Sequence, residues 1–407
     1  MIRKKFLIPD YVLNFKCTMC TECCKRWQIN FDKETVKKYD YFSTLDEDFA
    51  AMLSSIKKEK DGGAIVKFNN KVEGNREGID LTEADVCPFL DEEGLCTIQR
   101  KYGIEALSDT CKMFPRGITL TERGYEISLT YACAAAAETL KKKLPIEFYQ
   151  DPKNFSFPSL HTQYNKIGNL LERSKVGKTN YYKIEELLIN IMQFRDIDID
   201  TRLILTGMII DKLKDGDMDG VKRYLRNIDQ FLIDQFNSLP AKPVIIMGFL
   251  NNIIASKIWI DMSEINMKEL FQLAYQQFNP LNNSDSQADR LLEAYNKYYR
   301  VGIEDINHIY ENYFVNFIFS KKFYTHKYMD AYFLMIFFYT LIRFFTICRC
   351  LAEKRKVDEN LVVAVINTIE RSIGHNVTFY EDILDQIKKG GYNRLPYMIS
   401  LVNLKLE

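Results

Sequence analysis

Four cysteines near the start of the chain have the spacing of metal ligands. Cys17, Cys20, Cys23 and Cys24 form the pattern CxxCxxCC within eight residues. A two-residue gap lets successive thiolates point into one small volume, where they can hold a soft metal or an iron–sulfur cluster. Adjacent cysteines diverge, which suits several irons or two neighbouring metals better than one tetrahedral ion. The alternative interpretation is a disulfide staple or thiols that only pack.

More cysteines follow in an ordered series, so that eight of the ten precede residue 134. The sequence predicts that these eight are the metal-binding residues: Cys17, Cys20, Cys23, Cys24, Cys87, Cys96, Cys111 and Cys133. We expect a [4Fe–4S] cluster, with zinc as the alternative because both accept all-thiolate ligation. The expected ligands are two early cysteines, one of the adjacent pair, and one distant cysteine: Cys17, Cys20, Cys23 or Cys24, and Cys96, Cys111 or Cys133.

The secondary structure around these cysteines is expected to be short and irregular. Residues 33–42 and 47–58 are predicted as helices, and residues 64–68 have the β-branched character of a strand. Residues 118–121 and 125–130 alternate like the strands of a hairpin, with a three-residue turn that ends at Gly124. This hairpin would bring Cys111, before it, close to Cys133, after it.

The order of these motifs resembles a known family. CxxCxxCC is followed by CPFL at Cys87, then by C-x-I at Cys96 and by CKMFPR at Cys111. This order is similar to the cysteine-cluster domain described as zinc- or iron-chelating, and more closely to the flagellin lysine N-methylases that carry it. The stretches 311–319 and 370–375 resemble the C-terminal half of that family, so the resemblance spans most of the chain.

The resemblance implies an enzyme that methylates lysine side chains of flagellin with S-adenosylmethionine as the methyl donor. A free lysine amine has a pKa of about 10.4 and must lose a proton before it can attack a methyl group. Tyr313 and Glu311 are the candidate catalytic residues for orienting or deprotonating the amine. Arg116 and Asn312 are the candidate cofactor-binding residues, since a guanidinium offers two parallel donors to a carboxylate. An ordinary salt bridge is the alternative role for Arg116.

Composition and periodicity predict the fold class. The chain has 407 residues, of which 47% are hydrophobic and 27% charged, as in globular proteins. From about residue 181 onward, apolar residues recur at helical spacing, and the later helices are rich in aromatic residues. We therefore expect an α+β, mostly α protein, with a small cysteine-rich metal-binding module at residues 1–150 followed by a large, mostly helical domain at residues 151–407.

Charge and hydropathy bear on partners and location. The chain has 55 Lys and Arg against 55 Asp and Glu, so no global field favours nucleic acid. The apolar run at residues 331–342 is too short to cross a bilayer of about 30 Å, so we expect a buried core helix and no membrane insertion. The start of the chain has no signal-peptide pattern, which predicts a cytoplasmic protein with reduced thiols.

No G-x-G-x-x-G motif or P-loop occurs, so glycine spacing gives no support to a cofactor site of the usual kind. Two other functions remain open at this point. The chain can be an iron–sulfur redox or electron-transfer protein whose cluster is the active centre, or a metal-binding adaptor without catalysis. Reduction signals and cofactor binding distinguish the three.

Overall fold

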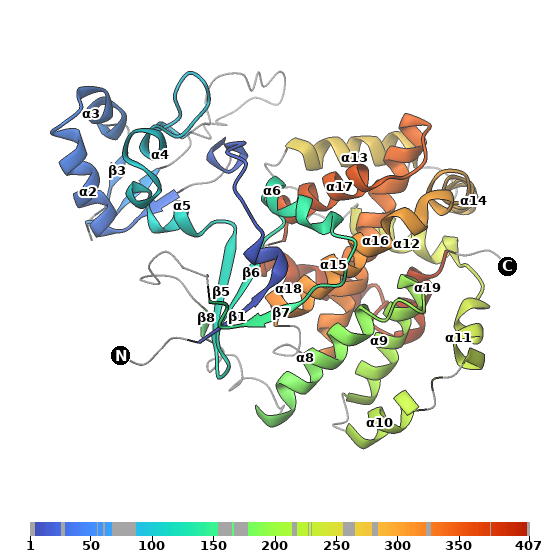
Figure 1. Ribbon diagram of the computed structural model, residues 1–407. Coiled ribbons are helices and arrows are strands. Elements are labelled where there is room, and N and C mark those ends of the chain that lie inside the picture. Colours follow the sequence, from blue (N-terminus) through green and yellow to red (C-terminus); the bar gives the residue numbers. More distant parts are fainter. Residues whose placement is uncertain are drawn as a thin grey trace.

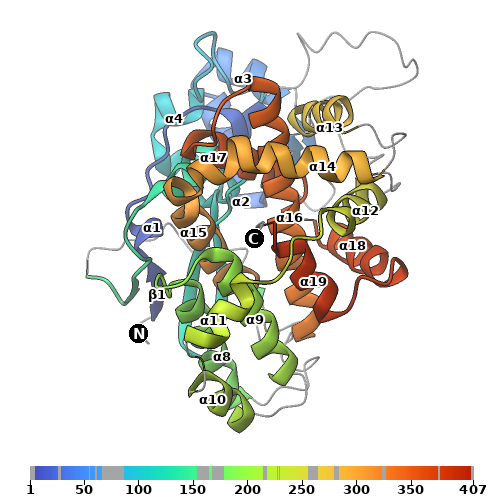
Figure 2. The same cartoon turned by 90° about the vertical axis from the view of Figure 1, so that its right-hand side faces the viewer.

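The structure is a computed structural model of the chain. It describes residues 5–25, 29–54, 56–59, 62–66, 87–153, 165–166, 178–213, 218–226, 228, 230–254, 265–278, 284–322, 327–374 and 376–404. Figures 1 and 2 show a small module, a sheet beside it, and a large helical part on the other side of the sheet. The prediction of an α+β, mostly α fold is confirmed.

The small module has a three-stranded antiparallel sheet in the order β2-β4-β3. Its elements are short: β2 (Ile29–Phe31), α2 (Lys33–Ser43), α3 (Glu47–Ser54), β3 (Lys57–Lys58), β4 (Ala64–Val66), α4 (Thr97–Tyr102), η2 (Ile104–Ala106) and α5 (Asp109–Met113). Helix α2 begins where the Asp32 side chain accepts a hydrogen bond from the Thr35 backbone N–H. The helix predicted at residues 47–58 ends at Ser54, because the chain then turns into strand β3.

A mixed five-stranded sheet lies between the module and the helices, in the order β7-β1-β6-β5-β8. Its strands are β1 (Phe6–Pro9), β5 (Arg116–Thr121), β6 (Gly124–Leu129), β7 (Phe148–Gln150) and β8 (Asn165–Lys166). The predicted hairpin is present as β5–β6, but Thr121 pairs with Gly124, so the turn has two residues instead of three. Gly124 has φ +117°, and a Cβ there would lie 2.4 Å from the Lys5 carbonyl oxygen. Glycine is therefore needed because β1 passes directly beside the turn.

The helical part contains most of the remaining described residues. Its longer helices are α8 (Lys178–Met192), α9 (Ile199–Leu213), α10 (Met218–Arg226), α11 (Gln230–Asn237), α12 (Pro243–Ile254), α13 (Ile265–Gln277), α14 (Ser284–Ala294), α15 (Ile303–Lys321), α16 (Tyr328–Glu353), α17 (Glu359–Ser372), α18 (Val377–Lys389) and α19 (Leu395–Val402). Short segments complete it: α1 (Asp10–Leu13), η1 (Glu22–Lys25), α6 (Ala134–Ala137), η3 (Glu138–Lys141), the π-helical η5 (Tyr295–Tyr299) and η6 (Arg300–Gly302).

Helix α16 lies at the centre of the helical part, packed against α9, α13, α17, α18 and α19. It is the one helix within the described ranges that is long and apolar enough to cross a membrane. Its most apolar window is completely buried inside the protein, as expected for a core helix. The helix is longer than the predicted run at residues 331–342, because Arg343 does not end it.

Arg343 remains inside α16 because its guanidinium group has partners in the core. The side chain is 2% exposed, and it donates a 2.6 Å hydrogen bond to the Leu401 carbonyl at the end of α19. It also lies 3.5 Å from the Asp200 carboxylate and over the ring of Tyr339. A buried charge needs such partners to offset its lost hydration, so Arg343 links α16 to α9 and α19.

Side-chain packing divides the chain differently from a boundary at residue 150. One hydrophobic cluster, which we call the module core, contains buried residues from Ile29 to Leu107. The second, which we call the helical core, joins the helices to Ile8, Ile127 and Leu129 of the five-stranded sheet. The sheet therefore packs with the helical part, where helix α15 lies against β6.

Candidate functional site

Eight cysteines converge on one cavity at the edge of the module. This cysteine cavity has a volume of about 520 Å³, and all the predicted metal ligands line it: Cys17, Cys20, Cys23, Cys24, Cys87, Cys96, Cys111 and Cys133. Residues far apart in the sequence are thus brought together, including Cys111 before the hairpin and Cys133 after it. The other two cysteines, Cys348 and Cys350, are buried in α16.

Local backbone geometry brings these thiols to the cavity. Met19 and Thr21 adopt left-handed conformations, with φ of 53° and 55°, which coil the first cysteine segment. The Cys87 backbone N–H donates a 2.7 Å hydrogen bond to the Cys24 carbonyl, so the second segment is held against the first. Cys96 and Cys133 precede helices α4 and α6, where the backbone N–H groups favour a thiolate.

The thiol groups share a cavity without being arranged as a finished coordination site. Cys23 Sγ and Cys24 Sγ lie 3.8 Å apart. Within the ranges that the structure describes, no group of three or more His, Cys, Asp or Glu side chains is placed to hold a metal ion. The all-thiol donor set fits zinc or an iron–sulfur centre, and ligation requires these side chains to rotate toward one another.

The cavity keeps most of its thiols protonated. Burial raises the pKa of Cys87 to about 12 and the pKa values of Cys111 and Cys133 to about 11. The hydrogen bond shared with Cys24 lowers the pKa of Cys23 to about 7, and the same bond raises the pKa of Cys24. Metal binding at such thiols releases protons, so a cation bound there would be held more weakly at low pH.

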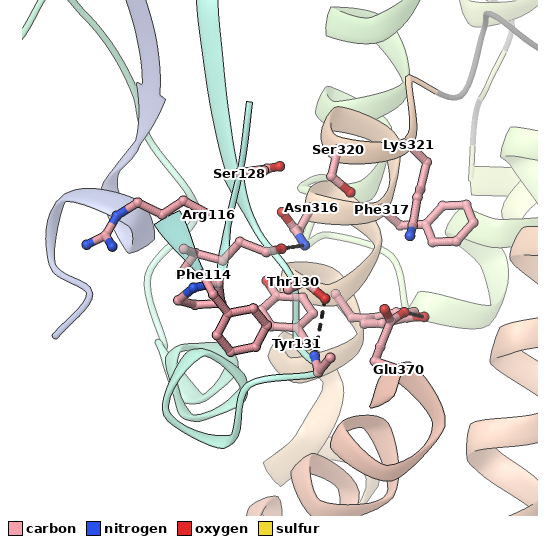
Figure 3. A pocket seen from close by; sticks show the side chains of 15 residues that line it. Phe114, Arg116, Ser128, Thr130, Tyr131, Asn316, Phe317, Ser320, Lys321 and Glu370 are labelled. Atoms are coloured by element: carbon pink, nitrogen blue, oxygen red, sulfur yellow. Dashed lines mark hydrogen bonds between the residues drawn. The ribbon is translucent and has the colours of Figure 1, made fainter. Parts of the chain in front are cut away.

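A second cavity adjoins the cysteine cavity. It has a volume of about 690 Å³ and lies between the hairpin, helix α15 and helix α17 (Figure 3). Phe114, Pro115 and Ala132 line both cavities, so the two share one wall. We call this second space the tyrosine cavity, because Tyr131 and Tyr313 lie on its surface.

Tyr313 and Glu370 form a hydrogen-bonded pair in the tyrosine cavity. The Tyr313 hydroxyl donates a 2.6 Å hydrogen bond to Glu370 Oε1, joining α15 to α17. Burial, together with the nearby Glu370 carboxylate, raises the pKa of Tyr313 well above its ordinary value. Tyr313 is therefore a neutral hydroxyl at physiological pH, and it acts as a hydrogen-bond donor.

Helix α17 lines the tyrosine cavity and contacts the wall of the cysteine cavity through two neighbouring residues. Glu370 lines the tyrosine cavity, while Arg371 lies 3.5 Å from the carboxylate of Glu22 in the cysteine segment. Arg371 also donates to the Ala132 carbonyl in the shared wall. One rigid helix thus holds both cavities in a fixed relation.

Arg116 lies at the border of the two cavities. It lines the tyrosine cavity, but its guanidinium group points away from Glu370 (Figure 3) and lies 5.1 Å from the centre of the Phe15 ring. Burial lowers the pKa of Arg116, and the nearby Cys17 and Cys133 thiols partly offset this effect. The side chain therefore faces the cysteines, and its predicted role in binding a cofactor carboxylate stays a prediction.

Glu311 and Asn312 line neither of the two cavities as described. Glu311 accepts hydrogen bonds from Arg195 and Arg202, at 2.7 and 2.8 Å. Asn312 donates to carbonyl groups in the segment before β7. These contacts are structural, so the predicted catalytic role of Glu311 and the cofactor role of Asn312 remain without support from their positions.

Tyr313 was predicted from the sequence as a catalytic residue, whereas no role was predicted for Glu370 or Tyr131. Tyr131 stands two residues before Cys133, so its proximity to the cysteines was available as a signal. Glu370 is 57 residues from Tyr313 along the chain, and only the packing of α17 against α15 places them together. His375, which ends the stretch 370–375 that resembles the methylase family, lies outside the described residues.

Two family descriptions match this chain. Residues 185–401 match the FliB lysine N-methylase C-terminal domain, which spans more than half of the chain. Residues 16–134 match the CxxCxxCC domain, described as "Putative zinc- or iron-chelating domain". The second match contains all eight cysteines of the cysteine cavity.

Curated relatives agree with these family matches. The chain is 34% identical over 160 residues to the flagellar biosynthetic protein FliU of Salmonella muenchen, covering 38% of this chain and 88% of that protein. It is 37% identical over 133 residues to lysine-N-methylases of Salmonella choleraesuis and Salmonella typhimurium, covering 31% of this chain and 29% of each relative. The match thus spans less than a third of those two enzymes. No solved structure matches the chain.

Proposed function

The chain belongs to the FliB lysine N-methylase family, and we propose that it transfers a methyl group from S-adenosylmethionine to lysine side chains of flagellin. The family supports the methylase reaction, and the named relatives support a flagellar substrate. We further propose that the enzyme acts in the cytoplasm, where flagellin subunits are made before export.

One observation carries the proposal: the cysteine cavity and the tyrosine cavity share the wall formed by Phe114, Pro115 and Ala132. A methyl transfer needs a donor and an acceptor held in contact. The two adjoining cavities differ in chemistry, since one is lined by thiols and the other by tyrosines and a carboxylate. We propose that the first holds the methyl donor and the second holds the acceptor lysine.

We propose that four of the eight cysteines hold a [4Fe–4S] cluster, with zinc as the alternative. Such a centre would either brace the module or hold the amine and carboxylate of the methyl donor at an open coordination position. We propose that Arg116, which faces Cys17 and Cys133, pairs with the carboxylate of the methyl donor. We also propose that Tyr313, on the far side of the shared wall, orients the lysine amine.

The first experiment determines the metal. The protein is purified without oxygen, and iron, zinc and acid-labile sulfide are measured together with the absorption spectrum. We expect iron and sulfide in equal amounts and a broad visible absorption. Colourless protein with stoichiometric zinc and no sulfide would decide against the cluster, while leaving the transfer reaction open.

The second experiment tests the reaction itself. Metal-loaded protein is incubated with flagellin and S-adenosylmethionine that carries a deuterated methyl group, and lysine mass shifts are read by mass spectrometry. We expect the labelled methyl group on flagellin lysines. Flagellin whose lysines have been acetylated is the matched control. If flagellin stays unmodified while electrochemistry shows a reversible couple, the redox function is the correct one.

A further inference from the structure

Glu370 differs from the other buried carboxylates in the part of the chain that the structure describes. Five other buried Asp and Glu side chains each lie within ion-pair distance of a Lys or Arg: Asp10, Glu126, Glu185, Asp200 and Glu311. Glu370 is 4% exposed, and among the described residues its side chain accepts a hydrogen bond from the neutral Tyr313 hydroxyl. A buried carboxylate is costly without a cation, which points to a cation brought by a ligand.

The two cations nearest to the cavity make other contacts. Lys321 lines the cavity, but its Nζ donates to the Gly374 carbonyl and lies 5.4 Å from the centre of the Tyr380 ring. Arg116 points toward the cysteines, away from Glu370 (Figure 3). Lys321 interacts with Glu370 electrostatically through space, but neither cation lies at ion-pair distance from the carboxylate in the described structure, so Glu370 can still pair directly with a further positive charge.

The rest of the cavity also suits an alkylammonium group. The rings of Tyr131 and Phe317 lie 6.0 and 6.2 Å from the ring of Tyr313, and all three line the cavity. Aromatic faces attract ammonium groups and also pack against methylene groups. A carboxylate beside aromatic walls is therefore a site for the end of a lysine side chain.

Gly374 makes room for the carboxylate at this place. A Cβ on Gly374 would lie 2.0 Å from Glu370 Oε2 and 2.7 Å from the Glu370 carbonyl oxygen. Neither contact is sterically possible, so an alanine would displace the Glu370 side chain and the backbone at the end of α17 without removing the charge. This gives a second way to test the carboxylate, by its position instead of its chemistry.

We propose that the tyrosine cavity binds the ammonium group of the substrate lysine, with Glu370 as its counter-ion and proton acceptor and Tyr313 as the donor that fixes the carboxylate. The identity of the ligand rests on the proposed methylase function. Glu370 takes one proton from the ammonium group. The nitrogen lone pair then forms the bond to the methyl carbon of the sulfonium donor, while the carbon–sulfur bond breaks and its electron pair stays on sulfur.

Equilibrium binding provides the first test. Nα-acetyl-lysine amide and Nα-acetyl-norleucine amide, an uncharged analogue that lacks the terminal amine, are titrated calorimetrically into metal-loaded wild-type protein. We expect binding of the lysine compound and at least tenfold weaker binding of the norleucine compound. Glu370→Gln should weaken lysine binding at least tenfold, and so should Gly374→Ala. The exposed Glu269→Gln is the matched control and should leave binding unchanged.

A second measurement needs no variant, in case Glu370→Gln fails to fold. Carbodiimide activates the carboxylates that it can reach, and an amine bound beside an activated carboxylate couples to it at concentrations too low to modify the others appreciably. Wild-type protein is treated with carbodiimide and the lysine compound, and modified peptides are identified by mass spectrometry. Modification of Glu370, suppressed by excess unlabelled lysine peptide, supports the site. Saturable modification of other carboxylates with Glu370 untouched overturns it.

The two proposals fail in different ways. If wild-type protein methylates flagellin and folded Glu370→Gln does so with unchanged kcat and KM, the lysine site is wrong and the methylase function stands. If wild-type protein binds the lysine compound through Glu370 but never methylates flagellin, the site stands and the proposed function is wrong. A rise in KM of at least tenfold together with a fall in kcat in Glu370→Gln, with unchanged secondary structure, supports both, because the variant loses the counter-ion and the proton acceptor.

Discussion

The module core and the helical core bury their side chains on very different scales. Around the cysteine cavity, the module core contains twelve buried hydrophobic residues among those that the structure describes between Ile29 and Leu107. The helical core is much larger, and one of its helices, α16, is buried on all sides along its most apolar window. Small cores rarely fold without a disulfide or metal to support them, whereas the helical core is large enough to need neither. We therefore expect the metal to stabilise one region and not the other.

The largest expected effect comes from removing the metal ligands. Replacing Cys24 and Cys111 together by serine should unfold the module, since a structural metal supplies on the order of 10 kcal/mol of apparent folding free energy. Hydrogen exchange measured by mass spectrometry should show lost protection in α2 and retained protection in α16. Equal loss of protection in both helices would mean that the two cores fold as one unit.

The second prediction concerns a buried ion pair of the helical part. Glu311→Gln leaves Arg202, which is buried, without its carboxylate partner. Breaking such a pair costs about 3–5 kcal/mol, so we expect a large fall in the free energy of unfolding, measured with denaturant. Metal content should not change. A variant with unchanged stability and abolished methylation would instead support the catalytic role predicted from the sequence.

The third prediction concerns acid. Burial opposes the charged form of Glu126, but Lys322 and Arg123 outweigh this effect and hold the pKa of Glu126 below its ordinary 4.5. A carboxyl group with a depressed folded-state pKa stabilises the protein above its unfolded pKa, and this stability is lost as the pH falls through the folded pKa. We expect the free energy of unfolding of the helical part to fall below pH 4.5. Glu126→Gln should be less stable at neutral pH and should lose less stability on acidification.

The smallest expected effect belongs to a cysteine outside the cavity. Cys348 is fully buried in α16, and burial raises its pKa well above its ordinary value, so it is an inert thiol. Cys348→Ala should cost about 1 kcal/mol of stability and leave metal content and spectrum unchanged. It is the matched control for the serine variants of the module. A loss of metal in Cys348→Ala would contradict the assignment of the two groups of cysteines.

Much of the architecture follows from sequence pattern, because the signals are local. Helical periodicity after residue 181 and strand alternation around Gly124 are each contained in a few neighbouring residues. The hairpin and α2 were accordingly predicted nearly at their observed bounds. The two-residue turn was missed because β1, which requires the glycine, is more than a hundred residues earlier in the chain.

The candidate site was predictable only in part, for the same reason. Cysteine type and spacing are visible in the sequence, so the residues of the cysteine cavity could be named. Glu311 and Tyr313 stand two positions apart on α15 and therefore face different sides of the helix. Sequence proximity suggested that both act on the substrate, yet only Tyr313 faces the cavity. Its partner Glu370 comes from another helix, and no local pattern signals that contact.

The anchoring of Arg343 has a consequence for the way in which the protein is made. Its carbonyl partner at Leu401 stands 58 residues further along the chain, so α16 leaves the ribosome well before α19 exists. Synthesis proceeds at about 5–20 residues per second. The nascent chain therefore spends several seconds with an apolar helix whose central guanidinium group lacks its carbonyl partners at the end of α19. During this interval α16 has the length and composition of a membrane-spanning helix. We expect correct synthesis to depend on keeping that helix shielded until α19 is complete.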